Sequence, residues 1–592
     1  AGPIDLRARF RHAPFSRPAD YARWTGEAFG AVDYADLAAI VRTFDVPLKV
    51  ERAQGAVRSW VTFDHARITR VVADIALTNV DVTLADNLQP LTLASLQGRV
   101  AQRVWGTDDG VGGQEFEATQ SALVTTSKQA LAPLDVKLRT TRAKGAAPAR
   151  TQIQANRVDV STLAWFFTHV PFARELRETV SKHAIAGTLT DVTASWPGAA
   201  PELKTLTLKT KFQALASAAQ AGVPQENQDM KRAIGLPGFE NLSGSIDMAD
   251  GAGSMQLASR NTTVILPGVF AEPRVTLAKL GASVRWKSDP ALEVRVESVA
   301  AANVDLELEA SGIHRAAPGE RGGPGRLDLT GRIVRLHAPA AYRYVPLAAG
   351  SGTLDWLQHA LVSGHVTDGT MRIKGDLSRF PFEGERDAEF RISARVVDAA
   401  LDVHPAVVQG ERSAEAARAW PLLKDIDADL LFDRASMTVT AKRGAAYSAK
   451  LSNVVARIPE LGPNAKLDVH GVAEGPLADM VRYVNTSPVS RWIGGITANA
   501  EASGNAKLDL RLGIPLGHAS DSKVTGALQF ANNDVQLADA PSFSRVNGTL
   551  NFTETGVRNA SLNASVLGGQ SRIAASTRPD GEPVFTATGI AT

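Results

Sequence analysis

The chain has 592 residues, of which 44% are hydrophobic and 21% are charged, a composition typical of a folded globular protein. Its 64 basic and 62 acidic residues leave a net charge of +2, so it lacks the basic excess typical of nucleic-acid-binding proteins. The sequence contains no cysteine, which excludes disulfides, thiolate-bound zinc, iron–sulfur clusters and thiol catalysis, and which fits an oxidising compartment.

Neither a secretory signal pattern nor a run of 18 apolar residues occurs in the sequence. It begins without methionine and ends at Gly589–Thr592 in a strand-like pattern. We therefore expect a segment of a larger protein, with any membrane anchor outside this chain.

The first 50 residues combine two patterns. Residues 4–11 alternate between apolar and polar side chains, which predicts a strand. Residues 33–43 place apolar side chains at helical spacing behind an acidic start, which predicts a short helix over Asp33–Thr43.

From Pro47 onward, short segments of strict apolar–polar alternation dominate, and such segments predict strands with one buried and one wet face. Turn-forming residues separate them at intervals of roughly 8–14 residues, which is hairpin spacing. We expect the apolar positions of these strands to line a common inner surface. The candidate lining residues are Leu206, Leu208, Val294, Val296, Val304, Leu306, Leu308, Leu467, Val469, Leu508, Leu510 and Leu512.

The number of such segments indicates roughly 35–45 strands, and open sheets of more than about 10 strands curl, split or close. Splitting into several β-sandwiches remains possible, but no long linker separates independent domains. The sequence therefore favours a mostly β fold: a long, curled, antiparallel sheet that forms an elongated hydrophobic groove. An elongated amphipathic ligand such as a lipid would fill an apolar face of that size.

Few segments predict helices, and three of these are interrupted by proline, which breaks helices into short pieces. They are Ser161–Lys182, Ala338–Ala360 and Ala478–Trp492, and an Ala-rich patch at Arg412–Trp420 is a fourth. Taking these inserts as boundaries, we expect one elongated β segment with four approximate sub-units, at 1–160, 161–337, 338–477 and 478–592.

A recurrent helix-to-strand unit follows each Pro-broken insert, and Leu354–Phe382 is its clearest example. Here an amphipathic helix is expected to turn at Gly364 and to become an alternating strand that ends at Gly375-Asp376. Large apolar side chains of these inserts either anchor the core or plug the groove. The candidate gating residues are Trp165, Trp356, Leu357, Leu361 and Trp492.

A second, shorter motif has the form apolar-x-Gly-x-apolar and occurs at Leu96–Val100, Leu242–Ile246 and Val546–Leu550. Ile426–Leu430 has the same form with alanine in place of glycine. The unequal spacing of these motifs indicates a meander with insertions of different length rather than a tight solenoid.

Catalytic and metal-binding patterns are weak. The eleven histidines are dispersed, and neither a nucleophile elbow nor a P-loop is present. Asp427 and Asp429 share one face of a predicted strand, an arrangement that glycosidases also use, although most such pairs are solvated surface groups. We therefore expect no enzyme activity, no metal site and no cofactor.

Several short motifs recur in a characteristic order: Trp60, Trp105-Gly106, Leu236–Gly244, Gly323–Leu329, Tyr342–Pro346, Trp356-Leu357 and Gly375–Phe382. In their order and spacing they resemble the YhdP family of AsmA-like proteins, from about Ile4 to the end of the chain. The resemblance implies an inner-membrane anchor, absent from this chain, followed by a periplasmic β-groove that carries phospholipids towards the outer membrane. It also implies a possible outer-membrane or periplasmic partner, and it supplies no catalytic motif.

We therefore expect a non-enzymatic groove for phospholipids, which binds no nucleic acid. The first alternative is a structural or adhesive β-repeat protein that binds protein or polysaccharide, with both sheet faces filled. The second is a carbohydrate-active enzyme that uses Asp427 and Asp429.

Overall fold

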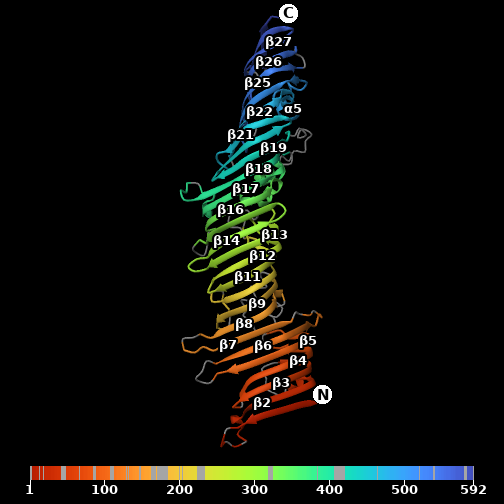
Figure 1. Cartoon of the computed structure of the whole chain (residues 1–592), viewed down its shortest axis with the longest axis vertical. Coiled ribbons are helices and arrows are strands. Elements are labelled where there is room, and N and C mark those ends of the chain that lie inside the picture. The colour runs from red at the N-terminus through yellow and green to blue at the C-terminus, as the bar shows by residue number, and fades with distance from the viewer. Residues whose placement is uncertain are drawn as a thin grey trace. The chain divides into compact units, whose positions relative to one another are not determined.

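The computed structural model describes residues 3–590 apart from 13, 16, 18, 42–48, 66, 85–87, 107–111, 129, 131–132, 146–147, 162–168, 170–183, 199–200, 203, 223–233, 318–323, 383, 406–419, 463, 519–520, 538–540 and 579–582. Most of these residues lie in strands, and the 29 strands found in them belong to one antiparallel sheet that is not closed into a barrel (Figure 1). The predicted fold class is confirmed.

Contacts divide the chain into two compact units. Unit 1 comprises Ala1–Val223, Ile234–Pro267 and Arg274–Glu297, and unit 2 comprises Pro224–Ala233, Gly268–Pro273 and Ser298–Thr592. The four sub-units inferred from the sequence stay a prediction.

Unit 1 is a meander in which each strand from β1 to β13 pairs with the next along the chain. These strands are β1 (Ile4–Arg11), β2 (Thr25–Asp36), β3 (Lys49–Asp64), β4 (Arg67–Thr83), β5 (Leu91–Trp105), β6 (Gly113–Thr125), β7 (Leu134–Thr141), β8 (Arg150–Asp159), β9 (Ala186–Pro197), β10 (Thr207–Ser217), β11 (Gly238–Ala249), β12 (Ala252–Ile265) and β13 (Arg274–Lys287). A short 3₁₀ turn, η1 (Tyr21–Arg23), precedes β2.

β14 (Glu293–Ala302) has residues in both units. Unit 2 continues with β15 (Leu306–Arg315), β16 (Arg326–His337), β17 (Leu361–Asp376), β18 (Glu389–Leu401), β19 (Leu423–Asp433), β20 (Ser436–Ala446), β21 (Ala449–Ile458), β22 (Lys466–Pro476), β23 (Glu501–Ser503), β24 (Asn505–Pro515), β25 (Lys523–Gln536), β26 (Phe543–Thr553), β27 (Gly556–Val566), β28 (Gly569–Thr577) and β29 (Pro583–Gly589). From β15 the order is again sequential, except that β22 pairs with β24 while the short β23 pairs with β25.

The residues that the structure describes contain fewer strands than the roughly 35–45 expected for the chain, because the estimate assumed strands of ordinary length. β4 has 17 residues, and β3 and β17 have 16 each, whereas strands of about 5–6 residues are most common. Several predicted strands are therefore parts of one long strand.

The long strands are bent by β-bulges, at which a residue adopts a positive φ and the register shifts. In unit 2 this occurs at Asp398, Asp425, Asn453 and Asn532, whose φ angles are 51°, 52°, 51° and 60°. Gln120 in β6 of unit 1 has the same geometry, with φ of 53°. A bulge bends its strand and increases the local twist, so repeated bulges curl a sheet.

At three of these bulges, Gln120, Asp398 and Asn532, a side chain from the next strand satisfies the backbone N–H group that the bulge releases. The N–H of Gln120 donates to Asp135 Oδ1 at 2.6 Å, and the N–H of Asn532 donates to Asn547 Oδ1 at 2.9 Å. These three bulges are thus built features with satisfied donors.

Two of the predicted helical inserts are confirmed, including their breaks at proline. The first contains η3 (Ala338–Tyr344), η4 (Leu347–Ala349) and α4 (Ser351–Ala360), with Pro346 between η3 and η4. The second contains α5 (Leu477–Thr486) and α6 (Val489–Trp492), separated at Pro488. In the described part of the chain, no helix is long and apolar enough to span a bilayer.

The helix expected over Asp33–Thr43 begins later than predicted. β2 continues to Asp36, and α1 (Leu37–Val41) follows it, capped by Asp36 Oδ1, which accepts from the N–H of Ala38 at 3.1 Å. Asp36 therefore acts as a cap at the helix start, while residues 33–35 belong to β2. Ser161–Lys182 and Arg412–Trp420 lie largely outside the described residues.

The prediction of a turn at Gly364 is also wrong. β17 begins at Leu361, directly after α4, and Gly364 lies within it with φ of 113°, next to a shift of register. A Cβ at this position would lie 2.7 Å from the Cα of Ala399, so glycine permits a close approach of two strands there. The predicted end of the strand at Asp376 is confirmed, and η5 (Leu377–Arg379) follows.

Candidate functional site

The register places apolar side chains of unit 2 in continuous rows that cross the strands. Successive partners in the first row are Leu306, Leu336, Val366, Val396, Ala428 and Ala441. Those in the second are Val439, Ala456, Val469, Leu512 and Val524. Those in the third are Ala473, Leu508, Leu528, Leu550, Ala560 and Ala575. We call the face that carries these rows the inner face of unit 2.

Unit 1 has an inner face of the same kind. One of its rows contains Phe116, Leu138, Ile153, Ala194, Leu208 and Met248. A parallel row contains Ala118, Val136, Ala155 and Val192. Because side chains alternate along each strand, the opposite, outer face carries the intervening residues.

Ion pairs between neighbouring strands mark the outer face. In unit 1, Arg99 Nε lies 2.6 Å from Asp74 Oδ1, and in unit 2, Lys523 Nζ lies 2.9 Å from Glu554 Oε1. Hydrogen bonds from these cations lower the pKa of Asp74, and lower that of Glu554 to about 2. Most of these side chains are well exposed, so the pairs contribute little to stability and chiefly show which face is wet.

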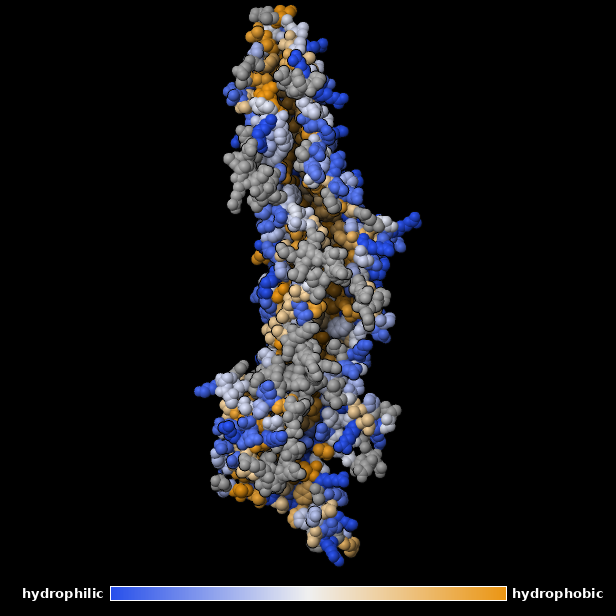
Figure 2. Space-filling model, turned by 180° about the vertical axis from the view of Figure 1, so that it is seen from behind, coloured by the Kyte–Doolittle hydropathy of each residue, from blue (hydrophilic) through white to orange (hydrophobic). Residues whose placement is uncertain are grey.

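Figure 2 shows hydrophobic residues gathered along a hollow that hydrophilic residues border, most clearly near the C-terminal end. Leu508, Leu510 and Leu512 of β24 are half-buried, so the protein covers them incompletely. Part of the inner face of β26–β28 is instead covered by the protein's own side chains. Val546, Leu562 and other apolar residues of these strands form a buried cluster there. The hollow is therefore lined by apolar side chains that remain partly accessible.

Most of the predicted lining residues lie on these rows or beside them. Leu208, Leu306, Val469, Leu508 and Leu512 belong to the rows given above. Three more predicted residues lie on the same strands as these and face the same side. Leu308 pairs with Ile333, Leu467 pairs with Ile514, and Leu510 pairs with Gly471 and Gly526. Val294 and Val296 are half-buried in β14, and Leu206 is half-buried directly before β10.

Val304 is an exception, because it lies in the turn before β15 with its side chain 86% exposed. The side chain of Asn303 accepts hydrogen bonds from the N–H groups of Asp305 and Leu306, at 3.0 and 2.7 Å. This Asx turn ends the alternation that the sequence pattern continued through Val304.

The candidate gating residues lie in different surroundings. Trp356 is half-buried on α4, and its Nε1 donates to the carbonyl of Val403 at 3.3 Å. Leu357 is half-buried beside it, and Leu361 is the first residue of β17. Trp165 lies outside the described residues. Gating by any of these side chains stays a prediction.

Trp492, at the end of α6, is 67% exposed, and its ring centroid lies 5.9 Å from that of Trp420. The ring centroid of Trp420 in turn lies 6.3 Å from that of Tyr483 on α5. Burial raises the pKa of Tyr483 to about 12. In this insert, the ring of Tyr483 therefore packs near that of Trp420, while Trp492 remains exposed.

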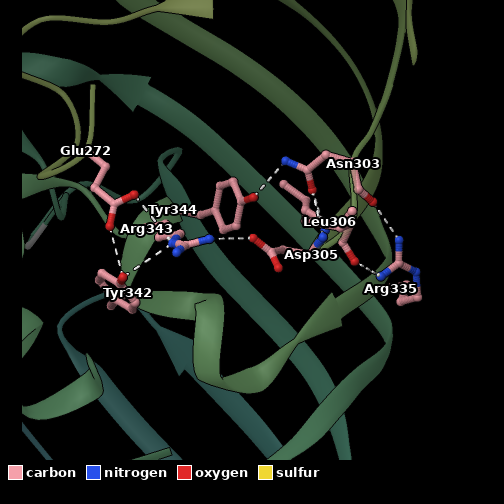
Figure 3. Close-up of polar contacts among 9 residues, drawn as sticks. Glu272, Asn303, Asp305, Leu306, Arg335, Tyr342, Arg343 and Tyr344 are labelled. Atoms are coloured by element: carbon pink, nitrogen blue, oxygen red, sulfur yellow. Dashed lines mark hydrogen bonds and ion pairs between the residues drawn. The ribbon is translucent and has the colours of Figure 1, made fainter. Parts of the chain in front are cut away.

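A polar cluster, which the sequence patterns did not indicate, fastens the first insert to neighbouring turns of unit 2 (Figure 3). Arg343 lies between Asp305 and Glu272, with distances of 2.9 and 3.4 Å to their carboxylates, and the Tyr342 hydroxyl donates to Glu272 at 2.9 Å. Asn303 Nδ2 donates to the Tyr344 hydroxyl at 2.9 Å. The hydrogen bond with Tyr342, followed by attraction to Glu272, raises the pKa of Arg343.

The paired carboxylates Asp427 and Asp429 lie on the outer face. Asp427 accepts from Arg443 Nε at 2.7 Å and from the N–H of Asp398, the bulge residue of β18, at 3.1 Å. The bond from Arg443 lowers the pKa of Asp427, and Lys442 pairs with Asp429 at 2.7 Å. Asp427 thus satisfies a bulge donor. Among the residues that the structure describes, no three His, Asp or Glu side chains gather as a metal site requires.

Comparison with known proteins assigns the family. The family model described as YhdP protein matches residues 1–591. The chain belongs to the YhdP family. In this YhdP-family chain, the motif Tyr342–Pro346 supplies Tyr342, Arg343 and Tyr344 of the polar cluster. No curated protein and no solved structure matches the chain.

Proposed function

We propose that this YhdP-family chain carries phospholipids between the inner and outer membranes, with their acyl chains shielded on the inner faces of its sheet. The observation that carries the proposal is the set of continuous apolar rows whose leucines, such as Leu508 and Leu512, remain half-buried. The family assignment is consistent with lipid transport.

The physical basis of the transport is partition. Each CH₂ group moved from water to an apolar surface is favoured by about 0.8 kcal/mol. Neighbouring strands lie about 4.8 Å apart, so along a row each apolar side chain has the next within contact distance. Within a unit, an acyl chain moving along such a row stays covered, and the polar headgroup remains in water at the open side.

The cellular setting belongs to the same proposal. The chain acts in the periplasm, held at the inner membrane by a segment outside this chain, and a periplasmic or outer-membrane partner receives the lipid. The process is non-enzymatic, and its direction comes from lipid gradients or from the partner.

The experiment compares the lipid that co-purifies with wild type, with Leu306→Asp and with the outer-face control Glu307→Gln. Leu306 is 6% exposed and begins the first row of unit 2, whereas Glu307 is exposed on the same strand. We expect Leu306→Asp to lose most bound phospholipid and the control to keep it, measured by lipid extraction and mass spectrometry. Equal lipid in all three proteins would contradict the proposal.

A further inference from the structure

The inner face of β5–β9 in unit 1 changes from polar to apolar over three successive rows. The row nearest the ends of these strands, which we call the inner edge, contains Val104 of β5 followed by Gln114, Thr140, Thr151 and Trp196. The next contains Gln102, Phe116, Leu138, Ile153 and Ala194, and the third contains Val100, Ala118, Val136, Ala155 and Val192. Rows on one face are two residues apart, so the change takes place over roughly 14 Å.

The polar groups at the edge have unused hydrogen-bonding capacity. Gln102 and Gln114 are exposed, and with Glu115, Phe116, Leu138 and Thr140 they line one pocket. We find no hydrogen bond from either glutamine amide to another described residue. Trp196 is 8% exposed, and its indole Nε1 has no acceptor in the part of the chain that the structure describes.

The charges of these strands lie on the opposite face. Lys137 Nζ pairs with Glu115 at 3.0 Å, and Arg139 stacks over the ring of Trp105 at 4.9 Å. Both contacts involve the outward positions of β5, β6 and β7. Glu115 also lines the pocket, but its carboxylate is already paired with Lys137. The polar groups of the inner edge that still lack partners are therefore neutral, and their neutrality selects the kind of ligand that can satisfy them.

A purely hydrocarbon ligand on this edge would remove water from the amides without replacing the lost hydrogen bonds, which is unfavourable. An acyl ester supplies carbonyl oxygens that accept from a glutamine NH₂ group or an indole N–H. Tryptophan is also enriched where apolar and polar layers of a membrane meet, for the same reason. The gradient from Gln114 to Ala118 along β6 thus matches the gradient from the ester groups of a lipid to its acyl chains.

We propose that the inner edge of β5–β9 is a binding site for the ester region of a diacyl lipid. The ester carbonyls lie at Gln102 and Gln114, and the acyl chains extend over Val136 and Ala118. The inference rests on the proposed function and adds to it a fixed orientation of the lipid in unit 1.

The experiment uses the absence of cysteine, because a single introduced cysteine can carry a bimane fluorophore. Thr140→Cys marks the polar row and Val136→Cys marks the apolar row of the same strand, β7. Each labelled protein receives phosphatidylcholine with a nitroxide quencher either beside the ester or at the end of the acyl chain. We expect the ester-side nitroxide to quench the fluorophore at position 140 about five times more than the fluorophore at position 136, because one neutral hydrogen bond favours a bound orientation by about that factor. The chain-end nitroxide should show the opposite preference.

The double variant Gln102→Leu/Gln114→Leu should abolish this preference. Gln152→Leu/Gln154→Leu, which changes two exposed glutamines on the outer face of β8, should keep it. Equal or reversed quenching at positions 136 and 140 in the parent protein would overturn the inference. A bimane at Leu510→Cys in unit 2 separates the two proposals: quenching there without orientation in unit 1 overturns this inference alone, and no quenching at any site overturns the proposed function.

Discussion

The inner faces of β5–β9 in unit 1 and of β22–β28 in unit 2 have the same antiparallel pairing but different side chains. In the first, a row of glutamine, threonine and tryptophan borders the apolar rows. In the second, the rows through Leu508 and Leu512 contain alanine, valine and leucine at the positions given above. Strand pairing and the chemistry of the inner face are therefore set independently of each other.

What the two regions share is the bulge. Gln120 in β6 and Asn532 in β25 both adopt a positive φ, and in both a side chain of the next strand accepts from the released N–H. The bulges curl the backbone in either unit, while the residues of the inner face decide what the curled surface binds.

A carboxylate placed on each inner face should affect the two regions very differently, and its effect on lipid binding is the largest that we expect. Leu510→Asp puts a charge among apolar neighbours, whereas Gln114→Glu puts one in a polar, exposed row. Leu510→Asp removes the apolar surface of one leucine side chain, so it should lower the amount of bound phospholipid about tenfold. Gln114→Glu should change the amount by less than about twofold.

The matched control is Arg511→Asp, on the outer face of β24 beside Leu510. Quantitative lipid extraction from the three variants checks the prediction. If Gln114→Glu lost as much lipid as Leu510→Asp, the two inner faces would not differ as described.

The grouping of apolar side chains on one face could be predicted from the sequence, because alternation alone determines which side chains of a strand share a face. That these side chains line a lipid path stays a prediction. Leu306 and Leu508 lie where their alternating segments placed them. Val304 was misplaced because Asn303 forms a local turn, which a period-two pattern cannot indicate. The overestimated strand count has a related cause, since a bulge interrupts the alternation without ending the strand.

The polar cluster could not be predicted from the sequence because its members are distant in the chain. Arg343 meets Asp305 and Glu272 only after the insert folds back on two turns. The edge row of unit 1 was overlooked for a different reason, since Gln114, Thr140 and Trp196 belong to three strands that become neighbours only through pairing.

The backbone strain in the recurrent apolar-x-Gly-x-apolar motif can be tested at Gly548 of β26. Its φ is 127°, and a Cβ there would lie 2.2 Å from the carbonyl oxygen of Ser561. Gly548→Ala should therefore lower the free energy of unfolding by about 1–3 kcal/mol, measured by denaturant titration.

Gly462→Ala is the control, because its added Cβ would meet nothing within 4 Å and its φ is not positive. Equal stability of the two variants would show that the strained glycine is dispensable.

Unit 2 can be examined further through the cluster that fastens its first insert. Arg343→Met removes the cation shared by Asp305 and Glu272 and leaves the half-buried carboxylate of Asp305 unpaired. We expect hydrogen exchange in Ala338–Ala360 to accelerate by about tenfold, since losing such a charge-assisted bond is worth about 1.5–3 kcal/mol.

Arg391→Met, which breaks an exposed pair with Asp433 on the outer face, should leave exchange in the insert unchanged. Unchanged exchange in Arg343→Met would mean that the apolar contacts of the insert suffice to hold it.

The smallest expected effect concerns the ion pairs of the outer faces. The pKa of Glu554 is lowered to about 2 by Lys523, so its unfolded form binds a proton at higher pH than its folded form. Its contribution to stability is therefore present above about pH 4.5 and is lost as the pH falls towards 2. Glu554→Gln should remove this part of the pH dependence, measured as unfolding midpoints between pH 2 and 6, and an unaltered profile would contradict the assignment.

The most direct measurement of the central claim is native mass spectrometry of the purified chain, followed by extraction and identification of what it holds. We expect bound phospholipid in the wild-type protein and much less in Leu510→Asp, with Arg511→Asp like wild type. A wild-type protein that carries no lipid, and takes up none from phospholipid vesicles, would contradict the claim that its inner faces shield acyl chains.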